Sequence, residues 1–254
     1  MSKRIMIDPG HGPGNVNRGS MGYYEYAGMW KVSSYLKAAL ERCGCIVGLT
    51  RGEKEDPSLT DRGKKAVGCD LFISEHSNAG GGGRGVEVYY SVKLPTDKNF
   101  AAALSKAVAG VMGTADRGAK TRIGTTGAGG DYYTVIASAQ AAGAGHVILI
   151  ENGFHDNALD EAFLLKEVNL EAIAEAQAKV ICGFLGVMYI ESEEGEEMVK
   201  RYQTIKEISK DMPWAVSTIE KLREKEYLKS LDLTADMIRI FVTLDMAGLF
   251  GEKE

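Results

Sequence analysis

The sequence predicts an α/β fold in which a mostly parallel, twisted sheet is flanked by helices and followed by a small all-α C-terminal module. Three observations lead to this prediction. Short apolar runs typical of strands alternate with longer segments whose apolar residues recur at helical spacing. Several short runs are apolar on both faces, as in strands that helices cover on either side. After residue 190 the chain becomes acidic, which indicates a second unit.

Six short runs are predicted as strands of the sheet. They lie in chain order at RIMID (4–8), CIVGLT (45–50), DLFISEH (70–76), GVEVYYS (85–91), YYTVIA (132–137) and VILIENGF (147–154). Because helical patterns lie between several of them, most neighbouring strands are expected to run parallel.

Three helices are predicted to cover this sheet. Their stripes recur at intervals of three and four residues: Met29, Val32, Leu36 and Leu40 in the first, Phe100, Ala103, Leu104, Ala107, Val108 and Val111 in the second, and Leu170, Ile173, Ala174, Gln177, Val180, Ile181 and Leu185 in the third. Gly44 follows the first stripe as a stop signal. A chain of 254 residues, 44% of them hydrophobic, is long enough to bury such a core.

The part of the chain beyond residue 190 is predicted as a separate helical unit. Residues 191–207 are predicted as an acidic linker that becomes the start of a helix, and residues 208–254 as a small helical module. The two stripes of that module are Val216, Ile219 and Leu222, then Met237, Ile240, Phe241 and Leu244, the latter with Thr234 as N-cap and Asp236 in its first turn. A module this small has a marginal core, so it is expected either to dock on a partner or to associate with a second copy.

Composition excludes several classes of protein. The formal net charge of -5 leaves no basic footprint for a nucleic acid. No apolar stretch reaches bilayer length, so membrane insertion is not expected. The opening MSKRIMID has no apolar segment behind it, which predicts synthesis in the cytoplasm without a signal peptide. Cys43, Cys45, Cys69 and Cys182 form no CxxC pair and are expected to be reduced, partly buried thiols.

Metal-competent side chains are expected to meet at one edge of the sheet. His11, His76 and Glu151 come at carboxyl ends of predicted strands, and Glu25 begins a helix near the same edge. Two histidines and one glutamate are a standard set for catalytic zinc, which leaves Glu151 as an unligated carboxylate able to accept a proton. Asn78 is expected to orient a ligand or a substrate carbonyl. Taken singly, His11 could be a turn residue, Glu25 a helix-dipole partner and Glu151 a salt-bridge partner.

Other polar residues and motifs are predicted to have ordinary roles. His146 and His155 are not expected to be ligands. His155 lies close to Asp156 and could line the cleft, but the sequence favours a solvated loop residue. Arg62 is expected to anchor a loop through hydrogen bonds. The glycine-rich run at 79–85 lacks the GK[ST] ending and leads into a strand, so it is not a phosphate loop. The sequence contains no GxSxG motif, so a serine hydrolase is not supported.

Several of these motifs together resemble one family. IMIDPGHG, a glutamate opening the first helix, LTDRGKKA, DLFISEHSNAG with GVEVYYS, and VILIENGFHDN resemble the zinc-dependent N-acetylmuramoyl-L-alanine amidases over residues 4–188. The resemblance implies that His11, Glu25 and His76 bind Zn²⁺ and that Glu151 is catalytic. It also implies a hydrolase that cleaves the amide bond between N-acetylmuramic acid and L-alanine in bacterial peptidoglycan, with residues 1–190 as the catalytic domain.

Some features leave the biological setting open. His146 stands where such enzymes often have proline, and the glycine- and alanine-rich stretch before it lies where substrate contacts are expected. The C-terminal module loosely resembles helical segments of some phage endolysins, which favours an endolysin that reaches the cell wall during host lysis. The alternatives are a spore mother-cell or autolytic amidase, a zinc peptidase on the same scaffold, and a protein that binds wall fragments without cleaving them. The unligated Glu151 disfavours the last of these.

Overall fold

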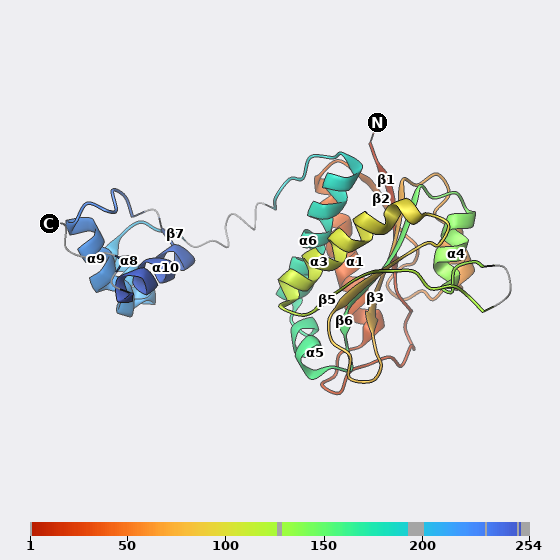
Figure 1. Cartoon of the computed structure of the whole chain (residues 1–254), viewed down its shortest axis with the longest axis horizontal. Coiled ribbons are helices and arrows are strands. Elements are labelled where there is room, and N and C mark those ends of the chain that lie inside the picture. Colours follow the sequence, from red (N-terminus) through yellow and green to blue (C-terminus); the bar gives the residue numbers. More distant parts are fainter. Residues whose placement is uncertain (1, 126–128, 193–200, 232, 248, 250–254) are drawn as a thin grey trace. The chain divides into compact units, whose positions relative to one another are not determined.

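The computed structural model describes residues 2–125, 129–192, 201–231, 233–247 and 249. The chain divides into two compact units, Met1–Ile190 and Glu191–Glu254, and each is described by itself (Figure 1). In the described part of the chain, no helix is both long and apolar enough to cross a bilayer. The four cysteines are buried free thiols, as predicted.

The first unit contains a six-stranded sheet with the order β2-β1-β3-β6-β4-β5. The strands are β1 (Arg4–Pro9), β2 (Ile46–Leu49), β3 (Leu71–Asn78), β4 (Val86–Tyr90), β5 (Asp116–Lys120) and β6 (His146–Phe154). All neighbouring pairs are parallel except β4 and β6, which run antiparallel. The predicted α/β fold with a mostly parallel sheet is therefore confirmed.

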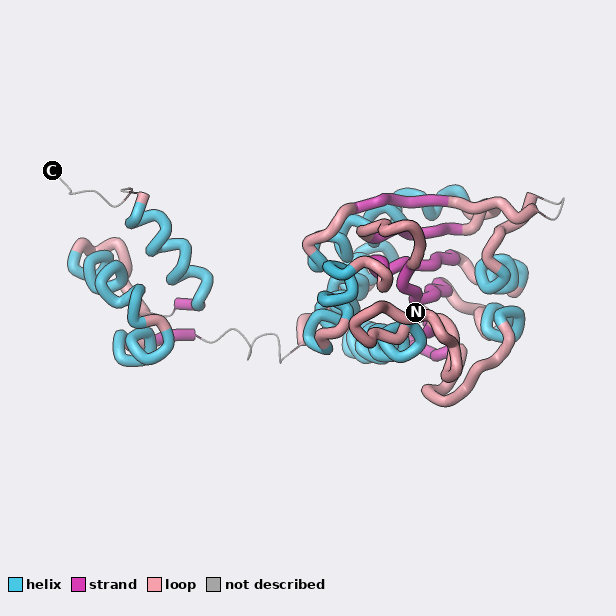
Figure 2. Tube along the Cα trace, turned by 90° about the horizontal axis from the view of Figure 1, so that it is seen from below, coloured by secondary structure: helices cyan, strands magenta, loops and turns pink. Residues whose placement is uncertain are grey.

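Helices cover both faces of this sheet (Figure 2). The helices of the first unit are α1 (Glu25–Arg42), α2 (Leu59–Lys64), α3 (Lys98–Met112), α4 (Thr134–Ala141), α5 (Ala158–Leu164) and α6 (Glu167–Leu185), with a 3-10 turn η1 at Pro95–Asp97. Most residues of the predicted stripes of α1, α3 and α6 lie in one large apolar cluster with strand residues such as Ile7, Ile73 and Ile150. In α3 the prediction is wrong for Ala103 and Val111, which are exposed. A smaller cluster joins α4 to the opposite face.

Two local predictions in this unit are wrong. The run at 132–137 is not a strand, because α4 begins at Thr134 and buries Val135, Ile136 and Ala139 on one helical face. A short apolar run fits a strand or a buried helix equally well, and the alanines that follow it favour the helix. Strand β5 was not predicted, since an edge strand reading DRGAK has no apolar alternation to reveal it.

The second unit combines short helices with a two-stranded antiparallel pair. Its elements are β7 (Arg201–Tyr202), α8 (Ile205–Asp211), η2 (Pro213–Ala215), α9 (Val216–Glu224), β8 (Leu233–Thr234) and α10 (Ala235–Met246). Tyr202, Ile208, Ile219 and Ile238 belong to its buried cluster. The helices at the two predicted stripes are present, but the β7–β8 pair means that the unit is not purely α.

The start of the second unit is only partly described. Thr204 caps α8 and forms a capping box with Glu207, so the helix begins within the segment predicted as a helix start. Residues 193–200 of the acidic linker, and the side chains of Thr234 and Asp236, lie outside what the structure describes.

Candidate metal centre and active site

The candidate site lies at the carboxyl ends of β1, β3 and β6. A pocket of about 350 Å³ opens there, lined by His11, Glu25, His76, Asn78, Tyr133, Glu151 and His155 among others. The edge that the sequence predicted thus gathers all five candidate residues in one pocket.

His11 lies between two glycines because the chain passes very close to its neighbours on both sides. A Cβ on Gly10 would lie 2.4 Å from the carbonyl oxygen of Glu75, and one on Gly12 would lie 2.5 Å from the side chain of Asp56. His11 itself has a φ of 56°, the left-handed conformation that is uncommon for residues other than glycine. The backbone is therefore held in a strained turn that presents the imidazole to the pocket.

Arg62 anchors the turn at His11 through hydrogen bonds, as the sequence predicted. The buried guanidinium donates to the carbonyl oxygens of Pro9 (2.8 Å), His11 (2.7 Å) and Pro57 (2.9 Å). It also donates to Oδ1 of Asp56 at 2.7 Å. Because the planar guanidinium reaches several acceptors in fixed directions, Arg62 positions much of the loop that carries His11. Arg51 adds hydrogen bonds to the carbonyl oxygens of Pro9 and Gly10.

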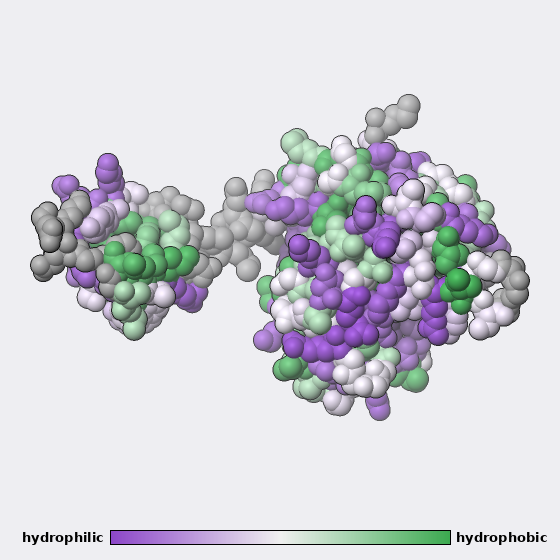
Figure 3. Space-filling model, viewed as in Figure 1, coloured by the Kyte–Doolittle hydropathy of each residue, from purple (hydrophilic) through white to green (hydrophobic). Residues whose placement is uncertain are grey.

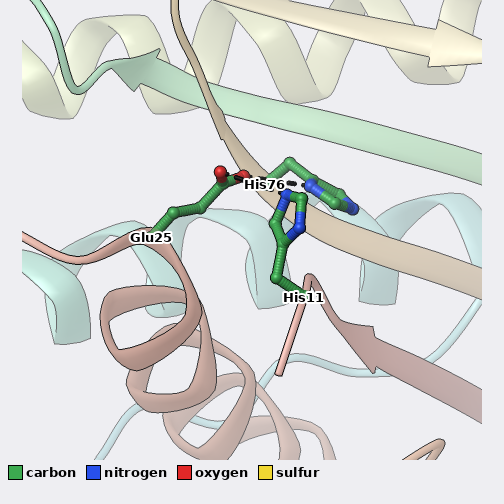
Figure 4. A group of neighbouring side chains, drawn as sticks. All are labelled: His11, Glu25 and His76. Atoms are coloured by element: carbon green, nitrogen blue, oxygen red, sulfur yellow. Dashed lines mark hydrogen bonds and ion pairs between the residues drawn. The ribbon is translucent and has the colours of Figure 1, made fainter. Parts of the chain in front are cut away.

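The three predicted ligands converge on one point (Figure 4). The potential ligand atoms of His11, Glu25 and His76 all lie within 4.8 Å of one another. Oε2 of Glu25 lies 3.1 Å from Nε2 of His11, and its Oε1 lies 3.0 Å from Nδ1 of His76. Two imidazoles and one carboxylate, brought together at a pocket wall, fit the donor set of a catalytic zinc ion.

Neighbouring polar groups fix these three side chains. Asn17 donates to Oε2 of Glu25 at 2.9 Å, and the backbone N–H of Ser77 donates to Oε1 at 3.1 Å. The amide of Asn15 lies 2.9 Å from Nδ1 of His11. Asn15 and Asn17 were not predicted as site residues, although the NVN segment between two candidate ligands was a usable signal.

The charges of the ligands are strongly coupled. Burial alone would raise the pKa of Glu25, but hydrogen bonds to His11 and His76 hold it far below its usual value. Burial alone would lower the pKa of His76, but the bond to Glu25 raises it to about 9. The proton therefore stays on the imidazole side of the pair, and a metal that binds there must release it.

Glu151, unlike Glu25, has a buried carboxylate oxygen without a hydrogen bond from the described residues. That oxygen is Oε2, and the residue is 8% exposed. In the sheet it lies opposite His76 on β3 and opposite Glu87 on β4. Burial is the main reason that the pKa of Glu151 rises to about 8. A carboxyl group in this state can take up and return a proton near neutral pH.

Asn78 lines the pocket with its hydrogen bonds already engaged. Its Nδ2 donates to Oε1 of Glu87 at 3.0 Å, and its Oδ1 accepts from the N–H of Ala79 at 2.8 Å. Glu87 is paired in turn with Arg117 and Lys120 on β5. A substrate-orienting role for Asn78 stays a prediction. Glu87 was missed by the sequence analysis, although a lone acid within GVEVYYS marks a group that needs partners.

Of the predictions for the two remaining histidines, one is confirmed and one is wrong. His146 is bonded to Asp97 through Nδ1 at 2.7 Å and does not belong to the ligand group, as predicted. The prediction for His155 is wrong, because the residue is 3% exposed and lines the pocket. Its ring stacks on Tyr23, and its Nδ1 lies 3.0 Å from Oγ of Ser77.

Known proteins resemble this fold and sequence. A family model described as N-acetylmuramoyl-L-alanine amidase matches residues 5–182. The endolysin of Bacillus phage SPP1 is 30% identical over 197 residues, which covers 74% of this chain and 68% of the endolysin. The amidase LytC of Bacillus subtilis is 28% identical over 182 residues, 69% of this chain but only 34% of LytC. The solved catalytic domain of CwlV, an amidase from Bacillus (Paenibacillus) polymyxa, has a TM-score of 0.62 and 28% identity, covering 73% of this chain and 99% of that domain.

Proposed function

Because the chain belongs to the N-acetylmuramoyl-L-alanine amidase family, we propose that it hydrolyses the amide bond between N-acetylmuramic acid and L-alanine in peptidoglycan. The observation that carries the proposal is the juxtaposition of two groups. The ligand atoms of His11, Glu25 and His76 lie within 4.8 Å of one another, and the unpaired carboxyl of Glu151 lies on the strand beside His76.

The three ligands are proposed to hold Zn²⁺. When bound, zinc polarises a carbonyl oxygen and lowers the pKa of a bound water to about 7. The chain keeps Glu25 ionised through its hydrogen bonds to His11 and His76. Hydrogen bonds from Asn17 and from the backbone N–H of Ser77 hold its carboxylate in place.

Glu151 is proposed to carry the proton. As water attacks the lactyl carbonyl carbon, a C–O bond forms and the carboxylate of Glu151 takes the proton. When the C–N bond breaks, the same carboxyl returns that proton to the departing nitrogen of L-alanine. The products are a lactyl carboxylate on the glycan and a free L-alanine amino group on the stem peptide. Burial raises the pKa of Glu151, which strengthens its carboxylate as a base and suits the uptake and return of one proton.

The biochemical test uses purified walls of Gram-positive bacteria. Wild type is expected to hold about one zinc per chain and to release peptides whose new amino terminus is L-alanine. Glu151→Ala is expected to keep the metal and to lose 10²-fold or more of the rate, on the order of a lost general base. His76→Asn is expected to lose the metal, whereas His146→Asn, which alters a histidine outside the ligand group, should keep it. New amino termini on D-residues would refute the amidase proposal.

We further propose that the biological role is that of a phage endolysin, which the likeness to the SPP1 endolysin supports. The second unit is proposed to bind wall polymer or a second copy of the chain. Expression inside a Gram-positive host should leave the cells intact until chloroform permeabilises the membrane, after which they should lyse. Cells that remain intact, while the purified protein still cleaves their walls, would contradict the endolysin role and leave the amidase chemistry standing.

A further inference from the structure

His155 is a buried histidine whose place is fixed by two contacts. Its ring stacks on Tyr23 with 6.3 Å between ring centroids and 29° between the planes. Its Nδ1 lies 3.0 Å from Oγ of Ser77, and only 3% of the residue is exposed. Tyr23 is itself 4% exposed, so it offers the ring a fixed surface. The imidazole therefore has little freedom to turn.

The opposite nitrogen of the ring has no protein partner. With Nδ1 engaged by Ser77, Nε2 of His155 makes no hydrogen bond to any residue that the structure describes. His155 also lines the pocket that contains His11, Glu25 and His76. Neutral and charged imidazole nitrogens both form hydrogen bonds, and a ligand in this pocket can supply the partner that Nε2 lacks among the described residues.

Ser77 connects this histidine to the metal ligands. Its side chain contacts His155, while its backbone N–H donates to Oε1 of Glu25 at 3.1 Å. Ser77 also follows His76 directly in β3. The ring of His155 is therefore fixed relative to the reacting centre through a single residue, which is the rigid support that a substrate contact requires.

We propose that His155 is a substrate-binding residue whose Nε2 hydrogen-bonds to an amide group of the muropeptide. The inference rests on the proposed amidase function and adds to it a residue that positions the substrate. Ser77 sets the orientation of the ring, and Tyr23 supports its face. Neutral imidazole can donate or accept at Nε2, so it can pair with either half of an amide.

Two substitutions separate the contribution of Nε2 from that of Nδ1, which contacts Ser77. His155→Asn places an amide near the position of Nδ1 and removes the group at Nε2. His155→Gln extends its amide to the position of Nε2. We expect His155→Asn to lower kcat/KM about tenfold, mainly through KM, as for the loss of one hydrogen bond to substrate, and His155→Gln to recover most of this. Zinc content and melting temperature should stay at wild-type values in both, as in the control His146→Asn.

The outcomes are distinct from those of the amidase test. If wild type releases L-alanine termini but His155→Asn retains full kcat/KM, the role of His155 is refuted and the amidase stands. If His155→Gln is as impaired as His155→Asn, an amide at the position of Nε2 does not restore activity, and the proposal fails. If wild type releases no L-alanine termini, the amidase function and this inference fail together.

A binding measurement observes His155 in a chain that keeps this histidine, and His155→Asn serves only to assign its resonance. The chain is labelled with ¹⁵N in its histidine rings and carries Glu151→Gln to prevent turnover. N-acetylmuramoyl-L-alanyl-D-isoglutamine is then added to saturation. The Nε2 resonance that disappears in His155→Asn is expected to shift, whereas that of His146 should not. An unchanged His155 resonance overturns the proposal.

Discussion

Glu161 is expected to fix the loop that leads to the ligand Glu25. It is fully buried in α5, and its Oε1 accepts from the backbone N–H groups of Met21 (2.8 Å) and Tyr23 (3.2 Å). The loop approaches so closely that a Cβ on Gly19 would lie 2.1 Å from the Glu161 carboxylate. Substitution with alanine would leave both N–H groups without an acceptor and open a space beneath the loop.

The expected cost follows from these two hydrogen bonds. An unsatisfied buried donor costs about 1–3 kcal/mol, so Glu161→Ala should lower the free energy of unfolding by about 3 kcal/mol. Glu161→Gln keeps one oxygen that can accept from both donors, so it should lose only the contribution of the charge, about 1 kcal/mol. Because the loop orients Glu25, zinc affinity should fall about tenfold in the alanine variant.

The assay must report on the first unit alone. The chain has two tryptophans, Trp30 in α1 of the first unit and Trp214 in the second. Urea unfolding followed by Trp30 fluorescence in a Trp214→Phe background gives the free energy of that unit, and a competing chelator gives its zinc affinity. If Glu161→Ala unfolds within about 0.5 kcal/mol of the background protein and binds zinc equally well, Glu161 does not hold the loop.

Three further predictions concern the surroundings of the site. Gly10→Ala should destabilise the first unit and reduce its zinc content, because the new methyl group would press on the ring of His76; wild-type metal content in this variant would refute the close approach. The second prediction concerns the pH dependence of stability at Glu87. Burial alone would raise the pKa of Glu87, but Lys120 and Arg117 hold it below the usual 4.5. The ionised carboxylate therefore stabilises the fold above pH 4.5, and this contribution is lost as the pH falls through the lowered pKa. The destabilisation of Glu87→Gln in urea unfolding should therefore be present at pH 7 and shrink towards pH 3, and a constant difference would contradict the pairing. Removal of zinc by a chelator should abolish wall lysis and lower the melting temperature, with both restored by added zinc, whereas lysis that persists at full rate without bound metal would exclude zinc from the reaction.

The sequence predicts where the candidate residues meet, because their positions follow from the order and direction of the strands. His11, His76 and Glu151 each come at the end of an apolar run, and the ends of parallel strands meet at one edge whatever the details of packing. The burial of His155 could not be predicted in the same way. It depends on Tyr23 and Ser77, which lie far from it in sequence and reach it only after the sheet and its loops have formed.

The differences between the predicted and observed strands arise where the local sequence pattern is ambiguous. The apolar run at 132–137 is too short for the spacing of its apolar residues to distinguish a helix from a strand. The packing of α4 against α2 is a tertiary contact that this spacing does not reveal. Strand β5 lies at the edge of the sheet and carries charged residues, among them Arg117 and Lys120, which pair with Glu87 on the neighbouring strand. Its place is thus determined by cross-strand ion pairs that a linear pattern of apolar residues does not reveal.

Two of the three proposed ligands depend on irregular backbone that other parts of the chain hold in place. The loop of His11 is fixed by the buried guanidinium of Arg62, and the loop before Glu25 is fixed by the buried carboxylate of Glu161. Each anchor satisfies several backbone groups that a loop cannot pair within itself. A substitution at either anchor should therefore weaken folding and metal binding together, whereas His76, which lies within β3 and is paired there with β6, should keep its place in both variants.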